Sequence, residues 1–112
     1  MMIYAITCGF IGLDFLTGLI KAFASGAFRS STMREGLYHK TGELLCIALG
    51  ILVNYAQTYI DLGISVPVAQ TLCAYIILME IGSAVENIGV ISPDVVPDKI
   101  KALFGLKKED KQ

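Results

Sequence analysis

Three long apolar blocks constrain this chain more than any other feature of its sequence. They cover about residues 1–27, 41–60 and 64–91, and two short polar gaps separate them. Each block reaches the roughly 20 residues that a helix needs to cross the hydrocarbon of a bilayer. Hydrophobic residues make up 54% of the 112 residues and charged residues 17%, whereas a soluble domain usually carries about 25% charge. The sequence therefore predicts an all-α membrane protein, a single domain over residues 1–112 with three transmembrane helices.

The first block is expected to remain in the protein as a span. It contains Asp14 and Lys21, and no basic segment precedes its apolar run. A cleaved signal peptide has the opposite layout.

The basic residues predict how the chain is oriented in the membrane. They lie in the first gap, about residues 28–40, and in the tail, residues 92–112, whereas the second gap carries only Asp61. The positive-inside rule places the first gap and the tail in the cytoplasm and the N-terminus outside. The net charge of −1 gives no basic footprint for a nucleic-acid partner. The predicted cytoplasmic basic residues are Arg29, Arg34, Lys40, Lys99, Lys101, Lys107 and Lys108.

A capping signal marks the start of a helix in the first gap. Thr32 and Glu35 have the spacing of a capping box, in which a hydroxyl and a carboxylate satisfy the first backbone N–H groups. The pattern predicts a helix start near Met33. That helix either continues through Gly36 and Gly42 into the second block or bends there.

Two prolines predict the starts of later helices. Pro67 is suited to the first turn of the third span, and Pro97 to the first turn of a short final helix. Ile100, Leu103 and Phe104 form an apolar stripe between lysines in that final helix. Such a stripe is typical of a short amphipathic helix that lies on the membrane surface.

Each span carries one polar face. Asp14 and Lys21 are two turns apart, about 10.5 Å along a helix axis, so each is expected to find its partner on another helix or in water. The polar faces fit two interpretations: an interior seam of a packed bundle, or the wall of a lumen. A lumen would require oligomerisation, because one bundle of three helices encloses little space. The residues of these faces are Asp14, Lys21, Glu43, Asn54, Gln57, Gln70, Glu80, Ser83 and Asn87.

Small residues predict where helices approach each other closely. Gly18, Ala22 and Gly26 recur at four-residue spacing in the first block, and Gly50 lies in the second. Such spacing lets helix backbones come together in a membrane.

The sequence contains no enzyme signature. It lacks a phosphate-binding glycine loop, a Cys–His metal spacing and a nucleophile set, so we expect no enzymatic activity, no cofactor and no metal. The one histidine, His39, is expected to be solvated rather than a pH sensor. Cys8, Cys46 and Cys73 each lie inside an apolar block and are expected to be small apolar fillers.

Three motifs give the chain a family resemblance. They are DFLTG at residues 14–18, KTGELL at residues 40–45, and YIILMEIGSAVENIG at residues 75–89, with Ser31, Met33 and Gly36 between the first two. With these motifs in this order, the chain resembles the phage lysis and toxin-secretion holins, small three-span proteins of Gram-positive phages, prophages and toxin loci. The resemblance covers nearly the whole chain. The tail departs from it slightly, because Glu109 and Asp110 dilute its lysines.

The resemblance implies hole formation, whereas the polar faces alone are only compatible with it. A holin oligomerises in the bacterial inner membrane and forms a timed hole through which an endolysin or a large toxin leaves the cytoplasm. Its partners would be lipid, further copies of itself and possibly an antiholin, with the enzyme or toxin as released cargo. Neutralising Glu80 or Asp14 is expected to alter the timing most. The alternatives are a small proton-coupled exporter, which usually has four spans, an antiholin, or a regulatory subunit of a larger membrane complex.

Overall fold

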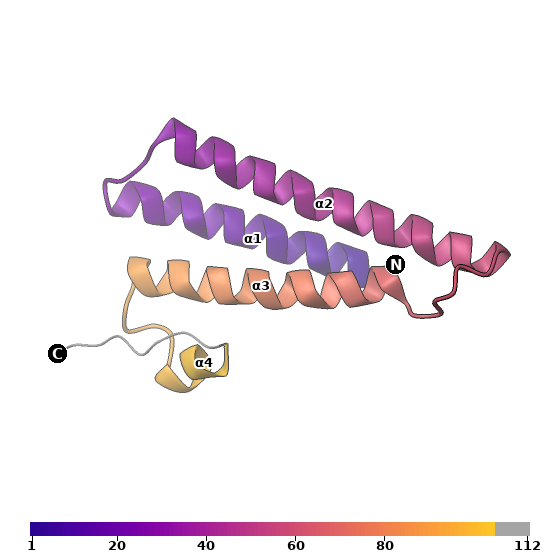
Figure 1. Cartoon of the computed structure of the whole chain (residues 1–112). Coiled ribbons are helices and arrows are strands. Elements are labelled where there is room, and N and C mark those ends of the chain that lie inside the picture. Colours follow the sequence, from indigo (N-terminus) through magenta and orange to yellow (C-terminus); the bar gives the residue numbers. More distant parts are fainter. Residues whose placement is uncertain (105–112) are drawn as a thin grey trace.

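Three long helices and one short helix make up the described part of the chain. The computed structural model describes residues 1–104 and contains no strand in that part. The helices are α1 (Met2–Ala24), α2 (Ser30–Tyr59), α3 (Val68–Ile91) and α4 (Asp98–Leu103), as Figure 1 shows. Lys107 and Lys108 lie outside the described residues.

The first three helices are long and apolar enough to cross a membrane. With 23 and 24 residues, α1 and α3 are each about 35 Å long at 1.5 Å per residue. At 30 residues, α2 is about 45 Å long, which exceeds the roughly 30 Å of hydrocarbon in a bilayer. The predicted fold, three spans followed by a short C-terminal helix, is confirmed.

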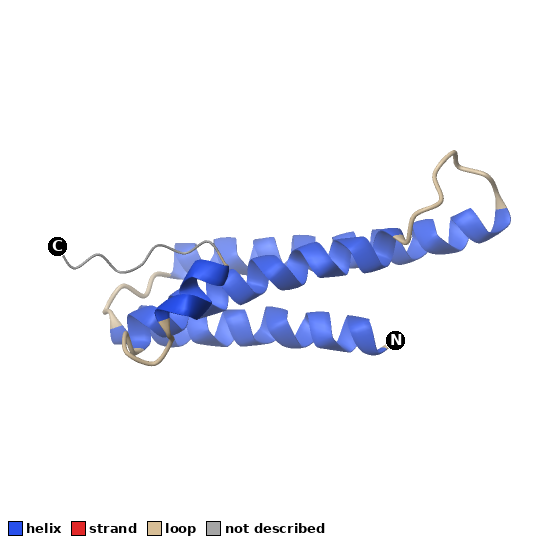
Figure 2. Cartoon of the chain, turned by 90° about the horizontal axis from the view of Figure 1, so that it is seen from below, coloured by secondary structure: helices blue, strands red, loops and turns tan. Residues whose placement is uncertain are grey.

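The helices form a bundle in which α3 is the shared element. α3 packs along both α1 and α2, whereas α1 and α2 touch each other in few places. α1 and α3 run in the same direction and α2 runs against them. The turn between α1 and α2 therefore lies at the same end of the bundle as α4, and the N-terminus lies at the other end (Figures 1 and 2).

The start of α2 differs from the prediction. α2 begins at Ser30 and continues without interruption through Gly36 and Gly42, so the loop predicted for residues 28–40 is helical over most of its length. The capping box is not formed, because Arg29 occupies the N-cap position and no side chain caps the helix. Thr32 already lies within the first turn, where its side chain cannot act as the cap.

Gly26 ends α1. It lies beyond the C-cap residue Ser25 and has a φ of 73°, a left-handed conformation that favours glycine. The Ala27 N–H donates to the Ala22 carbonyl at 2.9 Å, and the Gly26 N–H donates to the Phe23 carbonyl at 3.3 Å. These two bonds form a Schellman motif, which satisfies carbonyls that the helix end leaves free. Within this one chain Gly26 packs against no neighbouring helix, since nothing lies within 4 Å of its Cβ position. Its predicted role in close helix approach stays a prediction for contacts between copies.

Both prolines lie directly before a helix. Pro67 is the N-cap residue of α3, and Pro97 is the N-cap residue of α4. α4 faces α3 through Lys101, whose side chain is buried and whose Cε lies 3.9 Å from the Cβ position of Gly89. Leu103 is 71% exposed, so the apolar side of α4 remains available to a membrane surface.

Large apolar side chains cover the outside of the bundle. In water such a continuous apolar surface would be a liability, but lipid solvates it directly. The interior holds a small apolar cluster of Ile11, Ile47, Cys73 and Ile76. Cys73 is fully buried, whereas Cys8 and Cys46 are exposed on the outer faces. Exposed leucines on these faces include Leu13, Leu16, Leu45, Leu49, Leu52 and Leu78.

Gly50 allows the close approach of α2 and α3. A Cβ at this position would lie 2.8 Å from the Cα of Ala69, which real Cβ contacts do not tolerate. We therefore predict that Gly50→Ala pushes the two helices apart and lowers the free energy of unfolding by about 1–3 kcal/mol, the usual cost of overpacking. Unfolding in mixed micelles, followed by circular dichroism, measures this change in the free energy of unfolding.

Gly42→Ala is the matched control for this prediction. Gly42 lies in the same helix, and a Cβ there meets nothing within 4 Å. Its replacement by alanine is expected to be neutral or stabilising, because alanine is the better helix former. Equal effects of the two substitutions would contradict the close approach at Gly50.

Candidate functional site

A buried cluster of charged side chains joins the three spanning helices. It consists of Asp14 in α1, Lys40 in α2 and Glu80 in α3, and we call it the charge cluster. The Lys40 ammonium donates to Asp14 Oδ2, and it donates to Glu80 Oε1 at 2.7 Å. Asp14 is 8% exposed and Glu80 2% exposed. One lysine therefore links all three helices through two ion pairs.

The charge cluster lies deep in the bundle. Asp14 and Glu80 each lie twelve residues after the first residue of their helix, about 18 Å along the axis. Lys40 lies ten residues into α2, about 15 Å along its axis. A lone charge near the middle of a membrane costs at least about 2.5–3.5 kcal/mol. Mutual pairing offsets that cost here.

Asn87 completes the surroundings of Asp14. Its side-chain Nδ2 donates to Asp14 Oδ1 at 3.0 Å and to Thr17 Oγ1 at 3.1 Å. The Thr17 hydroxyl in turn donates to the Asp14 backbone carbonyl at 3.0 Å. Both carboxylate oxygens of Asp14 thus have donors, one from α2 and one from α3. Gly18 lies beside this network, with its Cβ position 3.5 Å from Asn87 Nδ2.

Sequence reasoning missed the role of Lys40. The prediction placed it in a cytoplasmic loop, but it lies inside α2 and its side chain is only 13% exposed. The signal was present in the spacing: Lys40 comes three residues before Glu43 and ten before Gly50, so it extends the inward face of α2 by one turn. Local hydropathy concealed it, because the polar residues around it resemble a loop.

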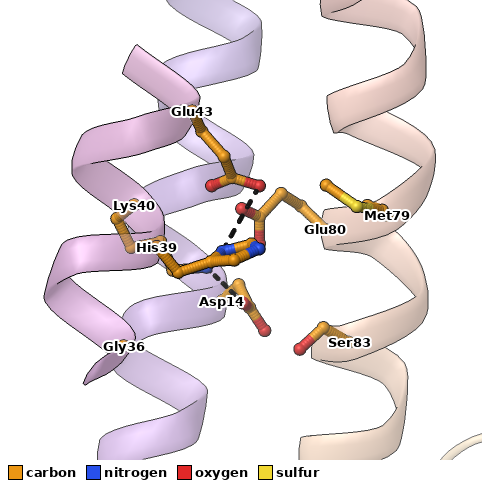
Figure 3. A pocket seen from close by; sticks show the side chains of 8 residues that line it. All are labelled: Asp14, Gly36, His39, Lys40, Glu43, Met79, Glu80 and Ser83. Carbon is orange, nitrogen blue, oxygen red and sulfur yellow. Dashed lines mark hydrogen bonds and ion pairs between the residues drawn. The ribbon is translucent and has the colours of Figure 1, made fainter. Parts of the chain in front are cut away.

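A cavity of about 360 Å³ opens beside the charge cluster (Figure 3). Glu43 points into it from α2 and faces Glu80 across it. Glu43 is 5% exposed, and neither of its carboxylate oxygens has a hydrogen-bond partner among the described residues. Glu80 Oε2 also has none. The residues that line the cavity are Asp14, Gly36, His39, Lys40, Glu43, Met79, Glu80 and Ser83.

A second set of polar contacts joins α2 and α3 near the other end of the bundle. Asn54 Nδ2 donates to Gln70 Oε1 at 2.9 Å, and Asn54 Oδ1 accepts the backbone N–H of Ala69 at 3.3 Å. That N–H belongs to the first turn of α3, where helical N–H groups lack intrahelical partners. Gln57 Nε2 donates to the Val66 carbonyl at 3.0 Å. These residues connect the helices but do not reach the charge cluster.

The remaining predicted residues in the described part of the chain form no ion pair with the charge cluster. Lys21 and Ala22 line a larger cavity of about 670 Å³, whose wall also includes Asp14, Lys40 and Asn87. Lys21 forms no ion pair with a described residue. Arg29, Arg34 and Lys99 are exposed at the bundle end that carries the α1–α2 turn and α4.

The sequence comparisons decide the family. A family model described as the bacteriophage holin family matches residues 1–108. The chain belongs to the bacteriophage holin family. This is a family of membrane pore-forming proteins without enzymatic activity. No curated protein and no solved structure matches this holin significantly.

The charge cluster should be the main polar support of the folded holin. Lys40→Met keeps the length of the side chain but leaves Asp14 and Glu80 without their cation. Breaking a buried ion pair by removing one partner costs about 3–5 kcal/mol. We predict a loss of that size in the free energy of unfolding, measured in mixed micelles by circular dichroism.

Lys21→Met is the control, because Lys21 is a lysine of α1 that forms no ion pair with a described residue. Its effect is expected to stay within about 0.5 kcal/mol, as for most positions without special contacts. The triple variant Asp14→Asn, Lys40→Met, Glu80→Gln removes all three charges together and should recover part of the stability. The account of the cluster fails if Lys40→Met costs no more than Lys21→Met.

Proposed function

We propose that this holin assembles in the bacterial cytoplasmic membrane and opens holes at a set time, which release an endolysin or a large toxin. The observation that carries the proposal is the charge cluster. All three spanning helices contribute ionisable groups to one buried network, while their outer faces are apolar. A purely structural bundle does not need such costly groups at its centre.

The closed monomer is compatible with harmless accumulation in a membrane. Asp14 and Glu80 face Lys40 and turn away from lipid. The surface in contact with lipid is dominated by leucine, isoleucine and aromatic side chains. A bundle of this kind is stable in hydrocarbon, because lipid solvates its apolar outer faces.

Opening a hole requires many copies and a rearrangement of their polar faces. Three helices are too few to surround a folded protein, so the wall of the hole is built from several chains. Asp14, Lys40, Glu43 and Glu80 then turn toward water, which solvates them better than a lipid-embedded bundle does. The apolar faces stay against lipid. The same groups thus hold the closed bundle together and line the open wall.

The membrane potential acts on the same groups. Moving one charge across the membrane potential changes the free energy by about 2.3 kcal/mol per 100 mV. A rearrangement that moves the buried charges along the membrane normal is therefore favoured or opposed by the potential. Its collapse shifts the balance between the closed and open arrangements.

The bundle end with the α1–α2 turn and α4 is proposed to face the cytoplasm. Arg29, Arg34 and Lys99 are exposed at that end. The opposite end carries Asp61 in the α2–α3 connection and the N-terminus. This distribution follows the positive-inside rule.

Expression of the gene alone in bacteria tests the proposal. After induction, release of a folded cytosolic enzyme into the medium is followed over time, with an energy poison added to parallel cultures before spontaneous onset. We expect an abrupt release, which the poison brings forward. Slow growth inhibition without protein release, even after poisoning, would indicate an exporter, a small channel or a partner subunit.

Three variants of the charge cluster sharpen this experiment, one expected to advance release and two expected to delay it. Lys40→Met leaves acidic groups unpaired in the closed bundle, so release should come earlier. Glu80→Gln removes a charge that favours the wetted state while Asp14 keeps Lys40 paired, so release should come later; Asp14→Asn should act in the same direction. Glu86→Gln is the matched control, because Glu86 lies in α3 on an exposed face. Unchanged timing in both Glu80→Gln and Asp14→Asn would contradict the role of the cluster.

A further inference from the structure

We propose that the cavity beside Lys40 is a proton-binding site, in which Glu43 and Glu80 share one proton and His39 exchanges it with water. The site is defined by geometry alone, and only its link to hole opening rests on the proposed function. The residues that face the shared proton come from all three helices: Asp14 from α1, His39 and Lys40 from α2, and Glu80 from α3.

The charges around the cavity do not balance. Asp14, Glu43 and Glu80 contribute three carboxyl groups, and Lys40 contributes one ammonium group. Lys40 is already engaged with Asp14 and with Glu80 Oε1. Glu43 is left with no hydrogen-bond partner among the described residues although it is almost completely buried. His39 lies 3.9 Å from Glu43 but is charged only when its imidazole is protonated. Beside a neutral imidazole, an ionised Glu43 would be buried without a counter-charge, a state that proteins avoid by protonation.

One shared proton gives two of the three unpaired oxygens a partner, one on each carboxyl group. The oxygens without a partner are both carboxyl oxygens of Glu43 and Glu80 Oε2. A protonated carboxyl group gains one O–H donor, whereas an ionised one only accepts. A proton shared by Glu43 and Glu80 places one O–H donor between the two carboxyl groups, while Glu80 Oε1 continues to accept from Lys40. The two side chains point toward each other across the cavity, as this contact requires (Figure 3).

His39 connects the cavity to the outside. Its side chain is 61% exposed, and its Nδ1 lies 3.9 Å from Glu43 Oε2. It lies four residues before Glu43 in α2, so the two side chains lie on the same face of the helix. An imidazole gains and loses protons readily near neutral pH. His39 is therefore placed to carry a proton between water and Glu43.

The described side chains around the cavity favour a proton over a metal ion. No group of three or more His, Cys, Asp or Glu residues in residues 1–104 has an arrangement that could hold a metal. Lys40 also places a positive charge at the cavity wall, which repels a further cation. A proton shared by two carboxyl groups requires no set of three metal ligands, and it is compatible with Lys40 at the cavity wall.

Loss of this proton should loosen the bundle. Two facing carboxylates repel each other, and Glu43 lies in α2 whereas Glu80 lies in α3. Deprotonation thus weakens the contact between these helices and favours the open arrangement. In liposomes with the purified holin, leakage of a trapped protein should begin earlier as the pH on the α4 side rises. Glu43→Gln should remove that dependence on pH.

Infrared spectroscopy of the purified full-length holin in lipid nanodiscs tests the site directly. A protonated carboxyl group has a C=O stretching band that an ionised group lacks, and the band shifts in D₂O. At pH 7 we expect one such band from the wild type. Glu43→Gln should abolish it, because the amide donates to Glu80 in place of the acid. Glu86→Gln, on an exposed face of α3, should leave it unchanged.

The rate of exchange tests the part played by His39. His39→Ala should keep the band but slow its shift after transfer to D₂O by about tenfold or more. An unchanged rate would overturn the exchange role. If Glu43→Gln does not fold, the carboxyl ¹³C signals of labelled wild-type protein report the protonation of Glu43 without any substitution.

Three results would overturn the site: no protonated carboxyl band in the folded wild type at pH 7, a band that survives Glu43→Gln, or a band that sodium ions abolish at constant pH. The last result would show that an alkali cation occupies the cavity instead. These readings do not require a hole to form. A normal band without protein release from cells would contradict the proposed function alone, and release without a band would contradict the proton site alone.

Discussion

Hydrocarbon offers a buried charge no partner except those that the protein itself supplies, and Lys40 is the partner on which this bundle depends. It pairs with Asp14 on one side and Glu80 on the other. α1 and α2 touch each other in few places, so the ion pair between Lys40 and Asp14 is a principal link between them. Asn87 holds the other oxygen of Asp14 from α3. The three helices are thus held in one arrangement by a few polar groups and by the close approach at Gly50.

The same constraint would allow the closed and open arrangements of the proposed function. Polar faces turned inward are satisfied by one another, and polar faces turned toward water are satisfied by solvent. Intermediate positions in lipid are costly, because charges there have neither kind of partner. In the proposed function, a bundle with such a barrier would remain closed while copies accumulate and would then open cooperatively. The unpaired carboxyl group of Glu43 lies where a small change in protonation would shift this balance.

Much of the architecture could be predicted from the sequence, because hydropathy and helical periodicity report directly on lipid. Hydropathy and periodicity predicted the three spans. They also predicted that the first gap and the tail lie at the same end of the bundle. Lys40 could not be recognised as a cluster residue from local hydropathy, since its importance comes from Asp14 and Glu80, 26 and 40 residues away. For Gly26, the four-residue spacing predicted helix packing. That spacing could not show that the left-handed backbone of Gly26 ends α1.

The central claim is that residues around the charge cluster are dry in the closed bundle and wet in the open hole. Ser83 lines the cavity beside the cluster. Ser83→Cys, in a background where the three native cysteines are alanine, can be labelled with a charged thiol reagent supplied on both sides of the membrane. Ser30→Cys, at the exposed start of α2, is the control that labels at all times. The account predicts that Cys at position 83 is protected before triggering and labelled once protein is released. Protection that persists while folded protein passes through the membrane would contradict it.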